Sequence, residues 1–419
     1  MVAALSTSFR TFNRSIRLFL LANILLGLSV DGVYAVLFNL YLLRLGYTSE
    51  FIGLANAAGL FSFALAGFLA GLSGSRWGSR RVMLLGASLL LTAGVLLPLA
   101  ESAPTGWQDS WIVVTYVLLL GGFAFFFVGG SPFMMGSAQV QQRNALFAIH
   151  SAVSSMAAFG GSLLGGALPG LINRLSSASL TEPAPYRYPM QLLVVFMLPA
   201  LFLTYATIDP RPEFTTRSAQ QGKQSRNWRR LPLLLVSMIA LIRLLQVAGL
   251  GATSTFINVY LDTDLLVPTA RIGLITSLSR LLGVPAALLV PRLTERFGNV
   301  RVALVGSLGA ALFIVPIAFV PLWTVAGAAF IGTRIMTNIR FPAFQVYIME
   351  MFEPDLQSML SGVMALAAGL SFALMALGGG YVIAHFNFQS LFLAGASITF
   401  LGTVILYLFY RHSAATDEA

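Results

Sequence analysis

Five charged residues lie inside long apolar runs of the sequence: Asp31, Arg243, Arg280, Arg334 and Arg340. Each costs about 2.5–3.5 kcal/mol at the centre of a membrane-spanning helix. Such residues normally face the interior of a helix bundle or a water-filled cavity rather than lipid. Each of the five is therefore a candidate for the path of a solute or an ion.

Polar and aromatic residues recur at helical spacing around three of these charges. Side chains at i, i+3, i+4 and i+11 lie on one face of a helix. The three stripes are Arg334, Thr337, Asn338 and Gln345; Arg243, Gln246, Thr253 and Tyr260; and Asp31, Tyr34, Phe38 and Tyr41. Asp31, Arg243, Gln246, Arg334 and Asn338 are expected to line one pathway. Arg280 is added to them, although its helix could face either the pathway or its own bundle.

The charges in the apolar runs do not balance, because four arginines accompany one acid. An anionic solute would supply the missing charge, and the guanidinium fork suits a carboxylate or a phosphate. Asp31 could instead carry a proton, with an affinity that responds to Arg243 and to the solute. A third interpretation is structural, in which each arginine binds a helix carbonyl or an acid and no ligand is involved.

The composition excludes a soluble enzyme. Hydrophobic residues make up 57% of the 419 residues and charged residues only 10%, whereas a soluble domain has about 25% charged residues. There is no cysteine, and the three histidines are scattered, so we expect no metal site and no cofactor. The motifs HExxH, GxSxG and GxxxxGK[ST] do not occur, which argues against a zinc protease, a serine hydrolase and an ATP-driven pump.

The apolar runs predict twelve membrane-spanning helices, since each needs about 20 residues. A domain of six helices is expected over 1–208 and a second over 231–419. Between them lies a polar linker, 209–230, the only long polar segment. The expected helices are 17–43, 50–72, 81–101, 111–135, 144–172 and 189–208 in the first half, and 231–261, 271–291, 301–321, 323–348, 357–384 and 389–410 in the second.

Basic residues in the loops predict the orientation of the chain. One set of loops carries only Arg44, Arg174, Arg187 and Arg271, against 17 basic residues in the other loops, the linker and the flanking segments. The richer side is expected to be cytoplasmic, which places both termini in the cytoplasm of a cell with the chain in its cell (inner) membrane. Nucleic-acid binding does not account for the net charge of +10, because the basic residues are spread over short loops.

The two halves repeat each other. Residues 37–42 read LFNLYL and residues 256–261 read FINVYL, and an Ile-Gly-Leu follows each copy. The next loops, GLSGSRWGSRRVMLLG from Gly71 and PRLTERFGNVRVALVG from Pro291, also match. The paired positions are Arg76 and Arg296, Gly78 and Gly298, Arg81 and Arg301, and Gly86 and Gly306. Three matched features at a nearly constant offset indicate duplication of a six-helix unit.

The first of these loops resembles the G-x-L-A-D-R-x-G-R-R/K signature of the major facilitator superfamily, and the resemblance extends over essentially the whole chain. Gly71, Arg76, Gly78, Arg80 and Arg81 match the signature, while Ser75 stands where the family usually has aspartate. The resemblance implies an all-α membrane protein with two pseudo-symmetric six-helix bundles around a central cavity, and solute transport by alternating access. It also implies that helices 1 and 7 line this cavity, which would place Asp31 opposite Arg243.

Two departures from the family bear on proton-driven antiport. Residues 118–127 of the fourth helix read LLLGGFAFFF, without the arginine common in proton-driven members, and residues 161–166 read GSLLGG where antiporters have GPxxGG. Both departures weaken the prediction of a drug–proton antiporter.

The repeated loops also predict a cytoplasmic gate. Gly71, Gly78 and Gly298 permit tight turns, and arginines beside them can bind helix carbonyls or acids on the opposite bundle. Simple anchoring of positive charge on the inner side is the alternative. The expected gate residues are Gly71, Arg76, Gly78, Arg81, Arg143, Glu295, Arg296, Gly298 and Arg340. Within this set Glu295 is expected to pair with Arg143, and Arg340 with Glu350 or Glu353.

These observations predict a secondary active transporter, and not an enzyme, that moves a small organic solute and works as a monomer in the lipid bilayer. An anionic or zwitterionic amphipathic substrate held by Arg243 and Arg334 is favoured, with a proton or another ion as a candidate for coupling. The alternative is a proton-coupled efflux antiporter for drugs or hydrophobic compounds that uses Asp31. A polytopic membrane enzyme or a sensor is a third class.

Overall fold

Helices account for every regular element in the residues that the computed structural model describes, which are 12–104, 106–139, 142–176, 178–208, 233–352 and 354–417. The chain begins with α2 (Arg14–Leu26), the π-helix η1 (Gly27–Tyr34) and α3 (Ala35–Arg44), which together form one continuous rod. The next helices are α4 (Ser49–Trp77), α5 (Ser79–Leu96), the short η2 (Leu97–Ser102), α6 (Gln108–Ser137), α7 (Arg143–Ser176), α8 (Ala184–Leu192) and α9 (Val194–Tyr205). The second half contains α11 (Leu233–Thr263), α12 (Thr269–Phe297), α13 (Asn299–Phe319), α14 (Trp323–Glu350), α15 (Pro354–His385) and α16 (Phe388–Asp417).

Eleven of these helical segments, within the described residues, are long and apolar enough to cross a membrane. The twelfth long helix is α14, which carries both Arg334 and Arg340. The prediction of an all-α membrane protein is confirmed. Its physical basis is that a helix satisfies its own backbone hydrogen bonds, as a segment surrounded by lipid must.

The chain divides into two compact units. The first contains 1–45 and 58–226, and the second contains 46–57 and 227–419. The expected halves, 1–208 and 231–419, remain a prediction, and the expected linker 209–230 lies outside the described residues. The first turns of α4 are grouped with the second unit, where Gly53 approaches Gly380 of α15 so closely that a Cβ on either glycine would overlap the other helix.

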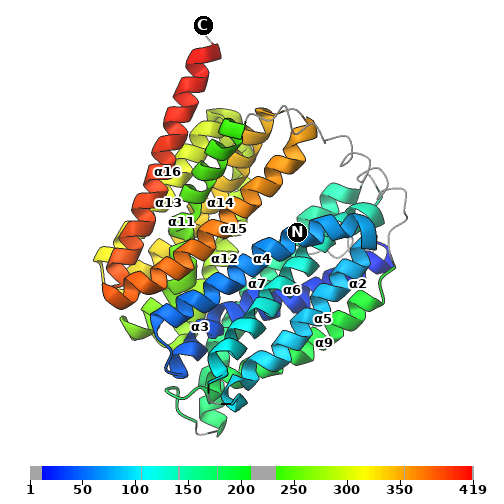
Figure 1. The fold of residues 1–419 in the computed structure, drawn as a ribbon, viewed down its shortest axis with the longest axis vertical. Coiled ribbons are helices and arrows are strands. Elements are labelled where there is room, and N and C mark those ends of the chain that lie inside the picture. Colours follow the sequence, from blue (N-terminus) through cyan, green and yellow to red (C-terminus); the bar gives the residue numbers. More distant parts are fainter. Residues whose placement is uncertain are drawn as a thin grey trace. The chain divides into compact units, whose positions relative to one another are not determined.

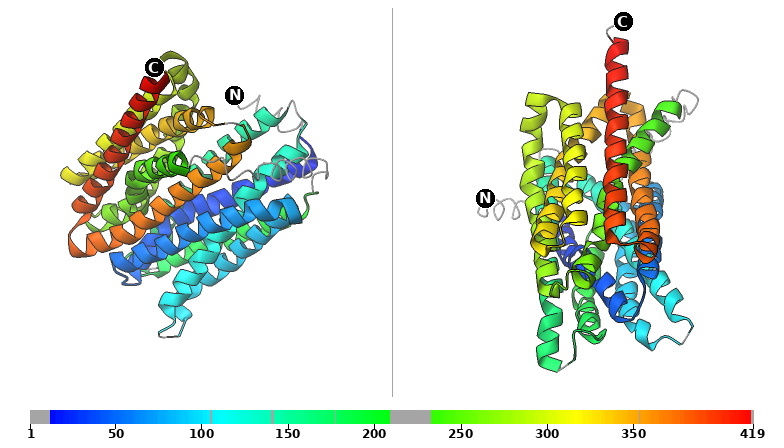
Figure 2. Two further views of the ribbon diagram at one scale, coloured as in Figure 1. Left: turned by 45° about the horizontal axis from the view of Figure 1, so that its top comes forward. Right: turned by 90° about the vertical axis from the view of Figure 1, so that its left-hand side faces the viewer.

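In the second unit, α11, α13, α14, α15 and α16 run side by side as long rods, coloured green to red in Figure 1. The last helix, α16, extends beyond its neighbours at the C-terminal end (Figures 1 and 2). An apolar core fills the space between these helices. It includes Ile239 and Ile242 of α11, Phe344 of α14 and Leu406 of α16, all fully buried.

Aromatic packing holds the interior of the first unit. Phe19 of α2 lies at ring-centroid distances of 5.9 Å from Phe126 of α6, 5.4 Å from Phe133 and 5.7 Å from His150 of α7. His150 therefore packs against the ring of Phe19. Asn23, one turn beyond Phe19, donates to Ser154 Oγ of α7 at 2.7 Å.

The first spanning rod contains a π-helical segment, η1, that the sequence pattern did not reveal. In η1 the amide of Ala35 donates to the carbonyl of Val30, five residues earlier. The segment packs on α7 through Gly32 and Gly161, because a Cβ on either glycine would collide with the other backbone. Gly165 of α7 meets Val33 in the same way. The close approach of the two backbones therefore accompanies the π-helical turn.

Candidate functional site

Arg243 lies on α11 with 7% of its surface exposed. Its Nε and Nη1 atoms are buried and have no hydrogen-bond acceptor in the described part of the chain. One face of the guanidinium is covered by the ring of Phe341, 4.8 Å from its centroid. A buried cation of this kind normally has a paired anion, so Arg243 presents an unmet demand for negative charge.

Arg340 of α14 is fully buried, with 1% of its surface exposed. Its Nη1 donates to the backbone carbonyl of Gln246 on α11 at 2.7 Å and lies 3.5 Å from Gln246 Oε1. This differs from the expected gate contact. Glu350 instead accepts from Asn299 Nδ2 at 3.4 Å, and Glu353 lies outside the described residues.

The interior position of Arg340 follows from a close helix contact. Gly306 of α13 has no side chain, and a Cβ built there would lie 3.0 Å from the Cβ of Arg340. The backbone of α14 therefore sits close against α13, and the long arginine side chain extends toward α11. Spacing along α14 alone does not indicate which helix the side chain of Arg340 meets.

Arg334 lies one and a half turns earlier on α14 and is half-buried. Its Nη2 donates to Ser254 Oγ of α11 at 3.1 Å, and its guanidinium lies 5.4 Å from the centroid of Phe330. Asn338 is also half-buried and lies against Gly283 of α12, where an added Cβ would overlap its amide. Both residues therefore lie on the polar side of α14 that their spacing predicted.

Further polar residues join α11 to α12 in the same unit. Thr276 donates to Asn258 Oδ1 at 3.3 Å, and both side chains are buried. Arg280 lies one turn beyond Thr276 on α12 and is half-buried. Contacts in the second unit thus join Arg340 to Gln246 and Arg334 to Ser254 between α14 and α11, and they bring Asn338 of α14 against Gly283 of α12. Arg334 meets α11 at Ser254, further along the helix than Gln246, where Arg340 meets it.

Asp31 lies in η1 of the first unit and is half-buried. Its expected partner, Arg243, belongs to the second unit, so this pairing remains a prediction. The π-helical setting is itself of interest, because single π-turns within α-helices occur frequently at functional sites.

The repeated loops have matching backbones. Gly78, between α4 and α5, has φ +83° and ψ 149°, and Gly298, between α12 and α13, has φ +81° and ψ 155°. This left-handed region favours glycine, which explains why both copies of the loop have one. The sequence repeat thus corresponds to a repeated backbone conformation.

The other expected gate residues lie at the ends of the same helices. Gly71 has open space where a Cβ would be, and Arg81, Glu295 and Arg296 are exposed. The guanidinium of Arg296 lies 5.3 Å from the ring centroid of Phe297. Arg143 begins α7 and is half-buried. The side chain of Arg76 lies outside the described part, and the pair between Arg143 and Glu295 remains a prediction because it would join different units.

Two polar contacts were not anticipated from the sequence. In the first unit Arg80 Nη2 donates to the carbonyl of Tyr205 at 2.6 Å. At the other end of that unit Glu101 accepts from Arg187 at 2.8 Å and from Tyr41 at 3.3 Å. The only hint of the second contact was the place of Tyr41 on the stripe of Asp31.

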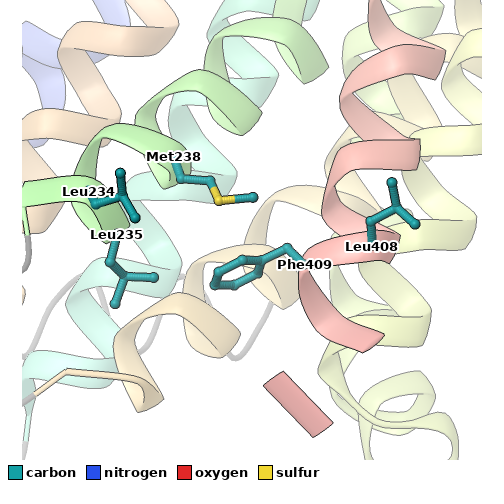
Figure 3. A pocket seen from close by; sticks show the side chains of 5 residues that line it. All are labelled: Leu234, Leu235, Met238, Leu408 and Phe409. Carbon is teal, nitrogen blue, oxygen red and sulfur yellow. The ribbon is translucent and has the colours of Figure 1, made fainter. Parts of the chain in front are cut away.

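An apolar pocket of about 310 Å³ lies between α11 and α16. Figure 3 shows its lining, which consists of Leu234, Leu235 and Met238 of α11 with Leu408 and Phe409 of α16. None of these side chains can recognise a charge, so the candidate site is the buried polar group of Arg243, Gln246 and Arg340 rather than this pocket. Within the described ranges, no three His, Cys, Asp or Glu side chains lie together as metal ligands would.

Comparisons with known proteins agree with this architecture. The sequence profile of a family described as Major Facilitator Superfamily matches residues 19–264 and 239–419. No curated protein sequence matches the chain.

Solved structures share the fold over nearly the whole chain. A D-xylose-proton symporter is 16% identical with a TM-score of 0.71, covering 94% of this chain and 97% of its own. A mutant of the nucleoside transporter NupG is 13% identical with a TM-score of 0.70, covering 94% and 99%. A bacterial homologue of the human lysosomal transporter Spinster is 15% identical with a TM-score of 0.69, covering 94% and 96%. At these identities the likeness concerns the fold alone.

Proposed function

Because the chain belongs to the Major Facilitator Superfamily, we propose that it moves a small organic solute with an anionic or zwitterionic group by alternating access. It is a multi-pass membrane transporter and not an enzyme. The proposal includes a cell (inner) membrane location with both termini in the cytoplasm, as the distribution of basic residues in the loops predicts.

The proposal of an anionic or zwitterionic solute rests on the unsatisfied guanidinium of Arg243. Arg243 is buried in the second unit, and two of its guanidinium nitrogens have no acceptor in the described chain. A solute with a carboxylate would satisfy these donors and the charge together. Arg334, which already binds Ser254, offers a second cation on the adjacent helix α14. A neutral sugar would fill the donors but leave the charge uncompensated.

The repeated loops supply the proposed gate. Arg76, Arg81, Arg143, Glu295 and Arg296 are proposed to form contacts that exist only when the cytoplasmic side is closed. Such contacts bias the equilibrium between two conformations without touching the solute. The matched left-handed glycines Gly78 and Gly298 support this proposal, because they fix the same loop geometry in both halves.

A second candidate function is proton-coupled efflux of hydrophobic compounds. It is favoured by the position of Asp31 within η1, where the helix packs on the GSLLGG segment of α7 through Gly32 and Gly161. A carboxyl group in a π-helical turn would be suited to a proton carrier whose protonation alters the helix. In this function Asp31, rather than Arg243, is the residue on which transport depends.

Transport by purified protein in proteoliposomes separates the two functions. The probes are labelled benzoate as an amphipathic anion, phenylalanine as a zwitterion and ethidium as a hydrophobic cation, each with and without a pH gradient. Arg243→Gln and Arg334→Gln should each lower benzoate or phenylalanine transport about 10-fold or more, since a hydrogen bond to a charged group contributes about 1.5–3 kcal/mol. Asp31→Asn should have a smaller effect.

The exposed Arg174, at the end of α7, gives the matched control Arg174→Gln, which should leave transport unchanged. If ethidium is moved instead, and only Asp31→Asn abolishes its movement, efflux replaces the leading proposal.

A further inference from the structure

Gln246 lies between the two most deeply buried arginines of the second unit. It is 2% exposed and sits on α11, one turn after Arg243. Arg340 Nη1 contacts both its backbone carbonyl, at 2.7 Å, and its side-chain Oε1, at 3.5 Å. A guanidinium has donors only, so the amide oxygen must face Arg340 and the amide nitrogen must point elsewhere.

The amide nitrogen of Gln246 has no acceptor within the described chain. Its Nε2 is buried without a hydrogen-bond partner, as are Nε and Nη1 of Arg243. Residues at i and i+3 lie on the same face of a helix, so these donors share one side of α11. Unsatisfied buried donors are rare in folded proteins and call for an explanation such as an unseen ion or ligand. Here three nitrogen atoms on adjacent turns of α11, two from Arg243 and one from Gln246, need an acceptor.

The surroundings favour an anion with a single charge. Arg340 binds Gln246, three residues after Arg243 on α11, and Phe341, next to Arg340 on α14, covers one face of Arg243. The Nη1 of Arg340 is bound to Gln246, while its buried Nε also has no acceptor in the described chain. On the face of α11 itself, the donors for a ligand are one guanidinium and one neutral amide. This donor set matches a carboxylate, whose two oxygens accept from a guanidinium and an amide in one plane. A phosphate dianion would call for a second cation in direct contact.

We propose that Arg243 and the amide nitrogen of Gln246 form a carboxylate receptor, and that Arg340 is a positioning residue that holds the amide in the binding orientation. This inference rests on the proposed function and narrows its substrate class to solutes with a planar monocarboxylate. Arg340 touches Gln246 and not the ligand. Its removal should therefore impair recognition of the carboxylate rather than the entry of the solute.

The variant Gln246→Glu provides the sharpest test, because it places a carboxylate of the same shape where the ligand's charge is needed. The measurement is thermal unfolding of the purified full chain in detergent at constant ionic strength. Sodium benzoate should raise the midpoint of the wild type by about 2 °C or more, as ligand binding to the folded state does. Benzamide, chloride and phosphate should raise it less.

Without any added anion, Gln246→Glu should unfold at a higher temperature than the wild type, and benzoate should no longer shift its midpoint. The exposed Gln389 at the start of α16 gives the matched control. Gln389→Glu should keep both the midpoint and the benzoate shift of the wild type. If Gln246→Glu does not fold, Gln246→Met is measured instead, and it should lose the benzoate shift without gaining stability.

Arg340→Met tests the positioning role. Without Arg340 the amide of Gln246 can turn either its oxygen or its nitrogen toward the ligand, so discrimination between benzoate and its neutral isostere benzamide should fall at least about fivefold. Arg340→Lys should restore part of it. A purely structural role would lower the unfolding midpoint and leave this discrimination unchanged.

The inference is overturned if Gln246→Glu, or Gln246→Met in its place, keeps the benzoate shift of the wild type, or if Arg340→Met keeps the discrimination. Its failure is distinguishable from failure of the proposed function. Benzoate that stabilises the wild type through Gln246 in detergent but does not cross proteoliposome membranes would leave the receptor in place and remove anion transport. Transport that depends on Arg243 but not on Gln246 would keep the proposed anion transport and remove the carboxylate receptor.

Discussion

Phe126 in the first unit and Arg340 in the second occupy matching places. Each lies against one of the paired glycines at the end of the repeated sequence, Phe126 against Gly86 and Arg340 against Gly306. A Cβ on Gly86 would lie 2.5 Å from the amide nitrogen of Phe126, and a Cβ on Gly306 would lie 3.0 Å from the Cβ of Arg340. Both side chains are 1% exposed. The same helix contact thus carries an aromatic ring in one unit and a guanidinium in the other.

The partners of the two side chains differ accordingly. Phe126 stacks on Phe19 of α2 at 5.9 Å, within a cluster of aromatic rings. Arg340 donates to Gln246 of α11, and the next residue on α14, Phe341, covers the guanidinium of Arg243. The comparison shows that the repeat preserves backbone approach through glycine, whereas the buried side chain beside it is free to change. The first unit uses this place for packing, and we propose that the second uses it for recognition.

The largest loss of stability is expected when the buried aromatic ring of the first unit is replaced by the arginine of the second. Phe126→Arg would put a cation against the ring of Phe19, which itself packs on Phe133 and His150. Breaking the charge balance of a buried site costs about 3–5 kcal/mol, so the variant is expected to be poorly folded. The yield of monodisperse protein and its unfolding midpoint measure this. Phe126→Leu, which keeps the site apolar, should cost much less, and equal losses for both variants would contradict the comparison.

The two glycine contacts should respond unequally to a methyl group. In Gly86→Ala the new Cβ would meet backbone atoms of α6, at 2.5 Å and 2.6 Å, which cannot move aside without shifting the helix. In Gly306→Ala it would meet atoms of α14 at 3.0 Å. Overpacking costs about 1–3 kcal/mol, and we expect Gly86→Ala near the top of this range and Gly306→Ala near the bottom.

Thermal unfolding of the two alanine variants measures the difference. Gly160→Ala on α7 is the control, because nothing lies within 4 Å of a Cβ at that position. An equal loss at Gly86 and Gly306 would show that the two contacts are not as different as the coordinates indicate.

The smallest effect is expected at an exposed pair of the second unit. Glu50 lies 3.5 Å from Nδ1 of His385, and both side chains are 48% exposed. Solvent-exposed pairs contribute about 0.2–1 kcal/mol. Glu50→Gln, which keeps the shape of the side chain and removes its charge, should therefore lower the unfolding midpoint by about 1 °C or less. A loss of several degrees would point to another role for Glu50.

The sequence predicted the helices well because a membrane span leaves a continuous apolar signature. The expected helix 271–291 lies within α12. The expected helix 301–321 overlaps α13 except for its last two residues. The glycine at the loop between them was also predictable, since a tight turn between two long helices requires a left-handed residue. Gln246 and Arg334 were placed on polar stripes by spacing alone, because side-chain direction follows from helical periodicity.

Other features could not be read from the chain. The π-helix η1 leaves no compositional trace, because it accompanies the meeting of Gly32 with Gly161, about 130 positions apart in the sequence. The surroundings of Arg340 were also inaccessible. Its expected partner was Glu350 or Glu353, both later in the sequence, whereas its hydrogen bonds go to Gln246 on α11.

By itself, the sequence determined that this protein is a duplicated, multi-helical membrane protein, because hydrophobicity, charge and repetition are properties of the chain. Only the tertiary structure decided which buried cation has an acceptor and which does not. Arg340 reaches the carbonyl of Gln246, while Arg243 retains two nitrogens that no described acceptor satisfies. The reason is that satisfaction of a donor depends on what other helices bring within about 3 Å of it, and spacing along one helix carries no information about that.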